Sequence, residues 1–193
     1  MTTDFFSTIT EARNEGRLVN LSDKRFENGS LENYQITDSY FERVEFFKMN
    51  FSAVAFVAVY FIDCQFIDCT FADDCSFYKT EFHNCRLGKC RFNSGEFNKC
   101  EFYSTHFSIN TWEKWSLDWS FFFSSDLRRN VFFESSLKGT IFSECKLFGF
   151  NVERIQIDKD YLPKFDQIDM SEDGNSTDYG SSEEILSLIC KID

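Results

Sequence analysis

Residues 41–71 read FERVEFFKMNFSAVAFVAVYFIDCQFIDCTF, a stretch in which phenylalanine returns at every fifth position. A period of five matches neither the 3.6-residue turn of an α-helix nor the two-residue alternation of a strand. A helix with this spacing would spread the rings around its whole circumference. Each five-residue unit is therefore predicted to form one short side of a wound coil, with its central side chain directed to a common axis.

The same period extends in both directions. Large apolar residues recur every five positions from Leu21 to Phe71, and after one six-residue step the series resumes at Phe77 and continues to Val152. Each buried ring is expected to contribute about 1.5–3 kcal/mol to stability. The predicted core stack contains Phe41, Phe46, Phe51, Phe56, Phe61, Phe66, Phe71, Phe77, Phe82, Phe92, Phe97, Phe102, Phe107 and Phe122.

The position two residues before each centre is usually small or slender, as an inward corner requires. Most of the eight cysteines lie there, and the exceptions are Met49, Asn110, Trp115, Asn130 and Phe150, so the coil is expected to be less regular past about residue 108. A zinc site would need a C-x-x-C pair or nearby histidines. Parallel side-chain vectors disfavour disulfides. Buried, reduced thiols acting as small apolar residues are the favoured interpretation.

This pattern resembles that of the pentapeptide-repeat family over roughly residues 21–152. The resemblance implies an all-β fold, a right-handed quadrilateral parallel β-helix with four five-residue sides per coil, followed here by a C-terminal α-helix. Roughly six to seven coils at a spacing of about 4.8 Å would form a rod roughly 30 Å long. As in other solenoids, each coil would contact only its neighbours.

The expected organisation has three parts: an N-terminal cap at residues 1–20, the β-helix at 21–157, and an acidic linker with a C-terminal helix at 158–193. Thr8–Gly16 fits a short capping helix and an irregular coil equally well. Ser182, Glu183 and Glu184 favour helix initiation. The residues that follow are too apolar for a free tail and are expected to cover the last coil, join a second subunit, or do both; they are Ile185, Leu186, Leu188 and Ile189.

The apolar terminal helix after an acidic connection resembles the end of the quinolone-resistance pentapeptide proteins that protect DNA gyrase. In those relatives this helix mediates a two-fold dimer, so the resemblance implies a homodimer. They often carry larger loops projecting from the coils, and the repeats of this chain contain only the one-residue register shift near residues 72–76. That difference argues against drug-type gyrase protection.

The charge of the chain constrains its partners. The net charge is −12, and residues 158–193 hold 3 Lys or Arg against 10 Asp or Glu, whereas residues 1–157 hold 17 against 22. This balance disfavours direct nucleic-acid binding and permits a basic protein partner. Neither a membrane-spanning apolar run nor a signal-type N-terminus is seen. A cytoplasmic protein with reduced cysteines is expected.

No catalytic residue, metal or cofactor is predicted, because His83 and His106 lie at outward positions without a recognisable triad. Tyr40 and Tyr60 are expected to stack on one face, with Phe121 and Ile141 further along it. These exposed aromatic residues indicate an interaction surface unless the terminal segment or a dimer mate covers residues 119–141. The candidate partner surface comprises Asp63, Asp68, Asp73, Asp74, Trp119, Phe121 and Phe123.

The resulting functional prediction is a non-enzymatic binding protein. The family resemblance implies that it modulates or protects bacterial DNA gyrase or topoisomerase IV, with an acidic face that mimics DNA. A simply solvated acidic surface is the alternative reading of the aspartates. The alternative function is a structural scaffold for another protein partner.

Overall fold

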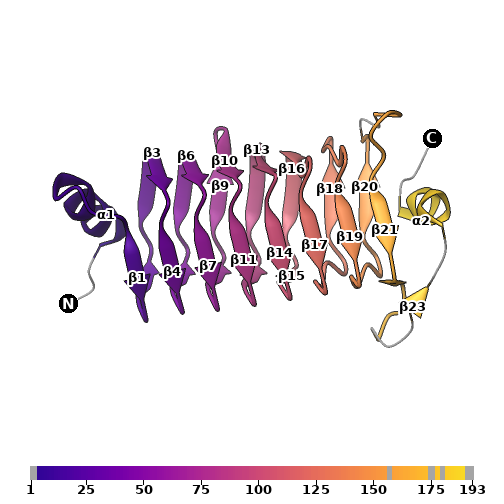
Figure 1. The fold of residues 1–193 in the computed structure, drawn as a ribbon, viewed down its shortest axis with the longest axis horizontal. Coiled ribbons are helices and arrows are strands. Elements are labelled where there is room, and N and C mark those ends of the chain that lie inside the picture. Colours follow the sequence, from indigo (N-terminus) through magenta and orange to yellow (C-terminus); the bar gives the residue numbers. More distant parts are fainter. Residues whose placement is uncertain (1–3, 156–157, 174–176, 179–180, 190–193) are drawn as a thin grey trace.

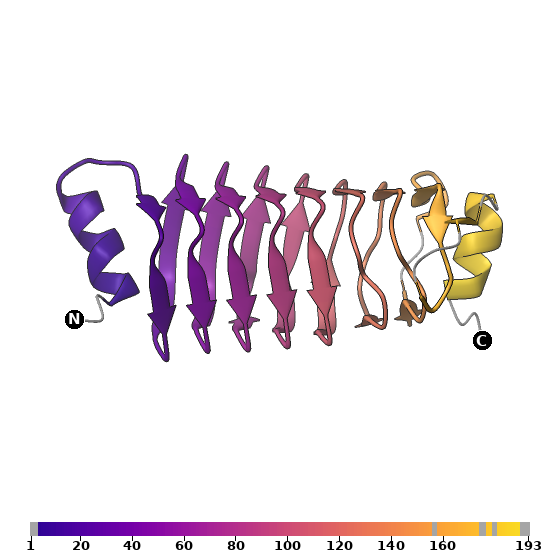
Figure 2. The same ribbon diagram turned by 90° about the horizontal axis from the view of Figure 1, so that it is seen from below.

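The computed structural model describes residues 4–155, 158–173, 177–178 and 181–189 and shows a straight rod of stacked coils (Figures 1 and 2). The predicted parallel β-solenoid is confirmed, and it has about seven turns. A helix lies at each end: α1 (Phe5–Asn14) at the N-terminal end and α2 (Ser182–Ile189) at the other (Figure 1). None of the described helices is long and apolar enough to cross a membrane.

Three parallel sheets line the rod; two of them have eight strands each, and the other has five and ends at Ser108, beyond which isolated bridges continue the pairing. The first contains, in spatial order, β1 (Asn20–Ser22), β4 (Tyr40–Glu42), β7 (Tyr60–Ile62), β11 (Glu81–His83), β14 (Glu101–Tyr103), β17 (Phe121–Phe123), β19 (Ile141–Ser143) and β21 (Lys164–Asp166). The second contains β2 (Arg25–Glu27), β5 (Glu45–Phe47), β8 (Gln65–Ile67), β12 (Arg86–Gly88) and β15 (His106–Ser108). The third contains β3 (Ser30–Thr37), β6 (Asn50–Val57), β9 (Thr70–Ala72), β10 (Cys75–Tyr78), β13 (Arg91–Asn98), β16 (Thr111–Ser116), β18 (Val131–Phe133) and β20 (Asn151–Glu153).

The strand register places like residues on top of one another. Phe46 pairs with Phe66 in the next coil, and Phe82 pairs with Phe102, so each turn takes twenty residues. The stacked rings lie 4.7 Å and 4.8 Å apart between centroids. Every phenylalanine of the predicted core stack is buried. The five-residue period therefore becomes four columns of rings around the axis.

The six-residue step near residues 72–76 adds one residue to a single corner. Asp73 and Asp74 both have positive φ there, at 54° and 65°. Strand pairing across this corner spans twenty-one residues, yet the rings of Phe71 and Phe92 remain stacked at 4.9 Å. The extra residue is thus absorbed outside the core, as in a bulge.

The turning device is a left-handed residue two positions after each central residue. Every corner from Asp23 to Arg154 has a φ between 47° and 68°, and only two of these corners are glycine. An L-residue in this conformation costs roughly 1–2 kcal/mol. The corner N–H groups are satisfied by the next coil: Arg43 N–H donates to the Ile62 carbonyl, and Lys48 N–H to the Ile67 carbonyl, both at 2.9 Å. The ladder of hydrogen bonds therefore stabilises a turn that has almost no Gly or Pro.

The small inward position carries a second ladder. Its side chain donates to the carbonyl of the central residue one coil earlier, as Cys100 Sγ does to Phe77 at 3.2 Å and Ser120 Oγ to Phe97 at 3.0 Å. The thiols are free and buried at Cys64, Cys69, Cys75, Cys85, Cys90, Cys100 and Cys145. Burial raises the pKa of the Cys145 thiol to about 12.

The exceptional residues at this position also point inward, since Met49, Asn110, Trp115, Asn130 and Phe150 are all buried. Trp115 lies opposite Gly95, where an added Cβ would stand 2.4 Å from the indole ring.

The pairing register holds through Glu153, so the expected irregularity past residue 108 is local. Alternate sides tighten into four-residue turns, in which, for example, Ser120 N–H donates to the Leu117 carbonyl at 3.1 Å.

The N-terminal end is closed by a helix rather than irregular coil. Asp4 caps α1 by accepting a hydrogen bond from Ser7 N–H at 3.3 Å. The Phe5 ring is 1% exposed and lies 4.8 Å from Phe26 and 5.1 Å from Phe46. The open end of the first coil is thereby filled, which protects an edge that would otherwise be available for pairing.

The C-terminal end is closed by more chain than the sequence indicates. The ladder continues past residue 157, because β21 pairs with β19 and stacks Phe165 on Phe142 at 5.2 Å. Beyond it, β22 (Ile168–Asp169) pairs antiparallel with β23 (Thr177–Asp178). Ser182 at the start of α2 accepts from Phe165 N–H at 3.0 Å, and Ile185 is buried. Helix α2 therefore packs on the last coil.

Candidate partner-binding surface

The outward side chains of β4, β7, β11, β14, β17 and β19 form a strip that we call the aromatic face. One column contains Tyr40, Tyr60, Glu81, Glu101, Phe121 and Ile141, and the other contains Glu42, Ile62, His83, Tyr103, Phe123 and Ser143. Tyr40 lies opposite Tyr60, and Phe121 lies opposite Ile141, as the period predicts. The tyrosines are 37% and 43% exposed. The sequence thus places a band of partly exposed rings on one side of the rod.

Ring contacts connect the second half of this face. The His83 and Tyr103 rings stack at 4.8 Å, and Tyr103 contacts Phe121 at 6.1 Å and Phe123 at 6.4 Å. The Tyr103 hydroxyl donates to Glu101. This hydrogen bond to the carboxylate raises the pKa of Tyr103 to about 12, so the phenol stays protonated at neutral pH. Aromatic pairs at these distances are mutually stabilising, which favours a pre-formed surface.

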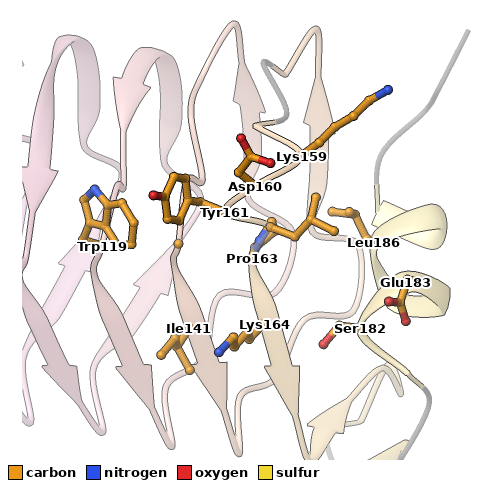
Figure 3. A pocket seen from close by; sticks show the side chains of 12 residues that line it. Trp119, Ile141, Lys159, Asp160, Tyr161, Pro163, Lys164, Ser182, Glu183 and Leu186 are labelled. Atoms are coloured by element: carbon orange, nitrogen blue, oxygen red, sulfur yellow. The ribbon is translucent and has the colours of Figure 1, made fainter.

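Trp119 stands at a corner beside the aromatic face (Figure 3). Its φ is 60°, and its indole lies against Gly139, where a Cβ would approach the ring to 2.5 Å. The Tyr161 ring meets the indole edge-on at 5.0 Å. Lys138 Nζ lies 4.7 Å from the Tyr161 centroid and pairs with Asp158 at 2.7 Å. The chain's own segment therefore covers part of Trp119 and leaves it 42% exposed.

A groove of about 640 Å³ opens between this aromatic pair and α2 (Figure 3). Its walls are mainly apolar, and charged side chains line it as well. The lining residues include Trp119, Ile141, Tyr161, Leu162, Pro163 and Leu186 together with Lys159, Asp160, Lys164 and Glu183. The volume falls within the range of ordinary ligand clefts.

The four candidate aspartates do not form a stripe. Asp63, Asp68 and the Asp73–Asp74 pair occupy successive corners of one coil, so they project from different edges of the rod. Asp63 accepts from Asn84 Nδ2 at 2.6 Å, and Asp73 accepts from Ser52 Oγ at 2.7 Å. The structure therefore gathers Trp119, Phe121 and Phe123 but separates the aspartates from one another, and these residues do not make an acidic face.

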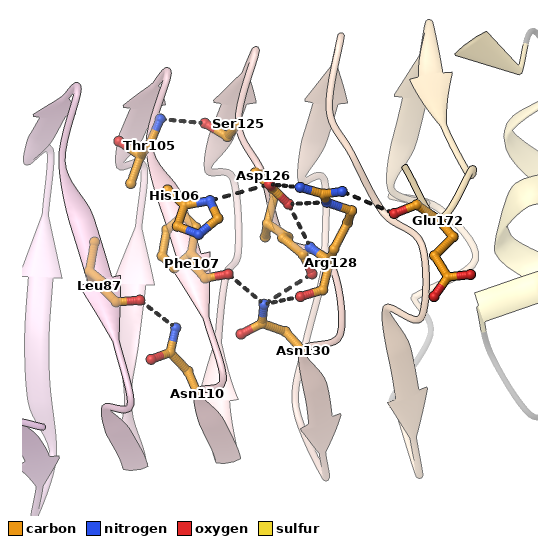
Figure 4. Close-up of polar contacts among 11 residues, drawn as sticks. Leu87, Thr105, His106, Phe107, Asn110, Ser125, Asp126, Arg128, Asn130 and Glu172 are labelled. Carbon is orange, nitrogen blue, oxygen red and sulfur yellow. Dashed lines mark hydrogen bonds and ion pairs between the residues drawn. The ribbon is translucent and has the colours of Figure 1, made fainter. Parts of the chain in front are cut away.

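A polar cluster on the neighbouring face was not anticipated from the sequence (Figure 4). Asp126 contacts His106 Nδ1 at 3.2 Å and accepts from Arg128 at 2.6 Å and 2.9 Å. Arg128 also donates to the Glu172 carbonyl at 3.1 Å. Burial opposes ionisation of Asp126, but the hydrogen bonds from His106 and Arg128 outweigh it and hold its pKa well below the ordinary value. The cluster fastens the segment after β22 to the coil.

The two histidines have separate roles. His83 contacts Glu81 at 2.8 Å on the aromatic face, and His106 belongs to the Asp126 cluster on the next face. Within the described part of the chain, no three potential ligands gather in a way that could hold a metal ion. The aromatic face and the groove beside it offer aromatic rings, carboxylates and apolar side chains on a rigid support, which are groups suited to non-covalent binding.

No protein-family model and no curated protein sequence matches the chain. Among solved structures, the chain is similar to HetL, a pentapeptide repeat protein involved in heterocyst differentiation regulation from the cyanobacterium Nostoc sp. strain PCC 7120. The TM-score is 0.54 and the sequence identity 11%, and the alignment covers 86% of this chain and 79% of HetL. Trypsin-treated QnrB1, a plasmid-mediated fluoroquinolone resistance protein, aligns with a TM-score of 0.46 at 13% sequence identity. The alignment covers 80% of this chain and 91% of the QnrB1 chain. Rfr23, a pentapeptide repeat protein from the cyanobacterium Cyanothece 51142, aligns with a TM-score of 0.45 at 9% sequence identity. The alignment covers 79% of this chain and 99% of the Rfr23 chain. The ring columns, the twenty-residue turn and the likeness to HetL together identify the chain's fold as a β-solenoid of the pentapeptide-repeat type.

Proposed function

We propose that this chain is a non-enzymatic, cytoplasmic binding protein that docks on another protein through the aromatic face. The observation that supports this most directly is the band of partly exposed rings held on a rigid ladder. Exposed apolar patches of this kind mark interaction sites. A rigid support also lowers the entropic cost of binding, because the surface needs no ordering.

The candidate partner is a bacterial type II topoisomerase, DNA gyrase or topoisomerase IV, whose activity the chain would modulate or protect. The net charge of −12 suits a basic partner surface and disfavours direct contact with nucleic acid. A supercoiling assay with micromolar protein tests this proposal. We expect inhibition, or relief of inhibition by a fluoroquinolone, that is lost in Phe121→Ser/Phe123→Ser and kept in the control Val131→Ser on another face. No effect of the wild-type protein on either enzyme would refute it.

The groove beside Trp119 favours a second candidate, a scaffold for a different protein partner. In this case Trp119→Ala would release the partner, whereas Phe121→Ser would not. A pull-down comparing these two variants separates the candidates, and an unchanged set of partners with Trp119→Ala would exclude the groove.

We further propose a homodimer through α2. Leu188 is 64% exposed and Leu186 lines the groove, but Ile185 is already buried against its own coil. The side chain of Ile189 lies outside the described residues. Light scattering of the full chain should give twice the monomer mass, and Leu188→Glu should restore the monomer. A monomeric wild-type protein would exclude this dimer.

A further inference from the structure

Two carboxylates stand side by side in the middle of the aromatic face. Glu81 on β11 and Glu101 on β14 are register partners. Adjacent strands lie about 4.8 Å apart, and like charges directly opposite one another destabilise a sheet. Among the described residues, neither carboxylate has a Lys or Arg partner; Glu81 contacts His83 Nε2 at 2.8 Å, and Glu101 accepts from the Tyr103 hydroxyl.

Several acidic side chains elsewhere on the rod have an arginine partner one coil away. Arg25 pairs with Glu45 at 3.0 Å one coil away, Arg43 with Asp23 at 2.6 Å, and Arg154 with Glu134 at 3.3 Å. Each of these pairs joins opposite charges along the coil axis. The strands of the aromatic face from β4 to β19 contain three glutamates and neither lysine nor arginine; Glu42 pairs with the corner residue Arg43, whereas no such pair forms at Glu81 or Glu101 among the described residues. Its charge is therefore complementary to a cationic partner.

Rings surround the two carboxylates. Tyr60 precedes Glu81 in the same column, and Phe121 follows Glu101. In the neighbouring column the His83 and Tyr103 rings stack at 4.8 Å. A guanidinium group suits such surroundings, because it binds carboxylates through two N–H groups and packs its flat face on aromatic rings. A lysine ammonium offers only a point charge.

We propose that the Glu81–Glu101 pair and the rings of Tyr60, His83, Tyr103 and Phe121 bind an arginine side chain from an extended basic segment of a partner protein. Binding replaces the repulsion between the carboxylates with charge-assisted hydrogen bonds to one cation. The ring faces supply cation–π contact to the same group. This inference deepens the proposed function and rests on it for the claim that the partner is a protein.

The test measures binding of fluorescein-labelled octa-arginine and octa-lysine to the full chain by fluorescence anisotropy. Octa-arginine should bind more tightly. Glu81→Gln/Glu101→Gln should weaken octa-arginine binding at least tenfold more than the control Glu32→Gln/Glu113→Gln. The control removes the same charge from outward positions of β3 and β16, so it corrects for general attraction to an acidic protein. Phe121→Ala should weaken octa-arginine binding more than octa-lysine binding.

Equal losses in the two double variants would overturn the inference, as would equal affinity for the two peptides. Thermal unfolding provides the check on folding: Glu81→Gln/Glu101→Gln should melt no lower than the wild-type protein, since the substitution removes a repulsion. Topoisomerase assays distinguish the two levels of the proposal. Arginine-selective binding without any effect on gyrase or topoisomerase IV refutes only that partner, whereas full inhibition by Glu81→Gln/Glu101→Gln refutes only the arginine site.

Discussion

The inner lining of the rod differs between its two halves. From Val44 to Cys100 the small inward position is mostly Val or Cys, whereas from Thr105 to Thr140 it is mostly Ser, Thr or Asn. The Cys, Ser, Thr and Asn side chains donate to the same acceptor, the carbonyl of the central residue one coil earlier, whereas Val has no donor. A cysteine sulfur is a weak acceptor there, whereas Ser120 Oγ donates to Phe97 at 3.0 Å and also accepts from Cys100 N–H at 3.1 Å.

This difference shows that the small inward position of the coil can be occupied either by apolar or thiol side chains or by hydroxyl and amide side chains. Val fills it by packing and Cys adds a donated hydrogen bond, while Ser120, Ser125 and Asn130 each form a second hydrogen bond to the coil before them. Buried polar groups stabilise only when they are fully paired. The N-terminal half should therefore tolerate volume-conserving exchanges at this position, and the C-terminal half should not.

Asn130→Leu should have the largest effect. The Asn130 amide donates to the Phe107 and Leu127 carbonyls at 3.1 Å and 3.0 Å and accepts from Trp112 Nε1 at 3.0 Å. Leucine would leave several buried groups unpaired, so the free energy of unfolding should fall by about 3 kcal/mol. Urea unfolding measures this, with the volume-conserving Met49→Leu as the apolar comparison. A loss below about 1 kcal/mol would contradict the importance of the polar lining.

Raising the pH should lower the free energy of unfolding through the Cys145 thiol, and a serine at this position should remove that effect. Burial raises the pKa of Cys145 to about 12, so its stabilising contribution is complete below the unfolded value of about 8.5 and is lost as the pH rises toward 12. At pH 10 the loss from this one thiol is about 2 kcal/mol. Urea unfolding at pH 8 and pH 10 should show that loss in the wild-type protein relative to Cys145→Ser. Parallel pH profiles for the two proteins would refute this reading.

Exchanging serine and cysteine between the two halves should change the free energy of unfolding less, and only the serine-to-cysteine exchange should lower it. Ser120→Cys keeps the donor to Phe97 but removes a good acceptor for Cys100 N–H, which should cost about 1 kcal/mol. Cys100→Ser keeps its bond to Phe77 and should change stability by less than about 0.5 kcal/mol. Thermal unfolding compares the two variants. Equal losses would mean that the second hydrogen bond makes no difference.

Relief of backbone strain at one corner should change the free energy of unfolding least, and it should raise it. Ile109 is β-branched, has a φ of 57° and is 71% exposed. Asparagine adopts this conformation more readily, so Ile109→Asn should raise the free energy of unfolding by about 0.5–1 kcal/mol. Asn84→Ile, at a corner already held by asparagine, is the matched reverse change and should lose a similar amount. A loss of stability with Ile109→Asn would show that Ile109 has a packing role.

The fold could be predicted because a single distance, five residues, recurs without a polar interruption at the centre. That distance also places column partners, so Tyr40 and Tyr60, or Phe121 and Ile141, could be paired from the sequence. The corners gave no such signal, since Ala53, Lys99, Trp119 and Ile109 share one backbone conformation without sharing a chemistry. Four sides of five residues also imply that residues five apart project from neighbouring edges, so the separation of Asp63 from Asp68 could have been predicted.

The two ends were the hardest parts to predict. Helix α1 lies outside the repeat, and it packs through Phe5, Ile9 and Ala12, of which Phe5 meets rings of the first two coils. Phe142 pairs with Phe165, and this separation is three residues longer than a regular turn. A search at a fixed twenty-residue spacing therefore does not find β21. The Asp126 cluster illustrates the opposite case. His106 and Asp126 are one turn apart, and a search for partners at twenty-residue spacing would have found them.

The seating of Phe5 has a consequence for assembly. Its ring occupies the position where a preceding coil would have contributed one, so the N-terminal end has the surface chemistry of a finished stack. Without it, the rings of Phe26 and Phe46 would be exposed at this end and could pack against another molecule. The packing of α1 at this end, together with that of α2 at the other, therefore favours a discrete molecule over a fibre.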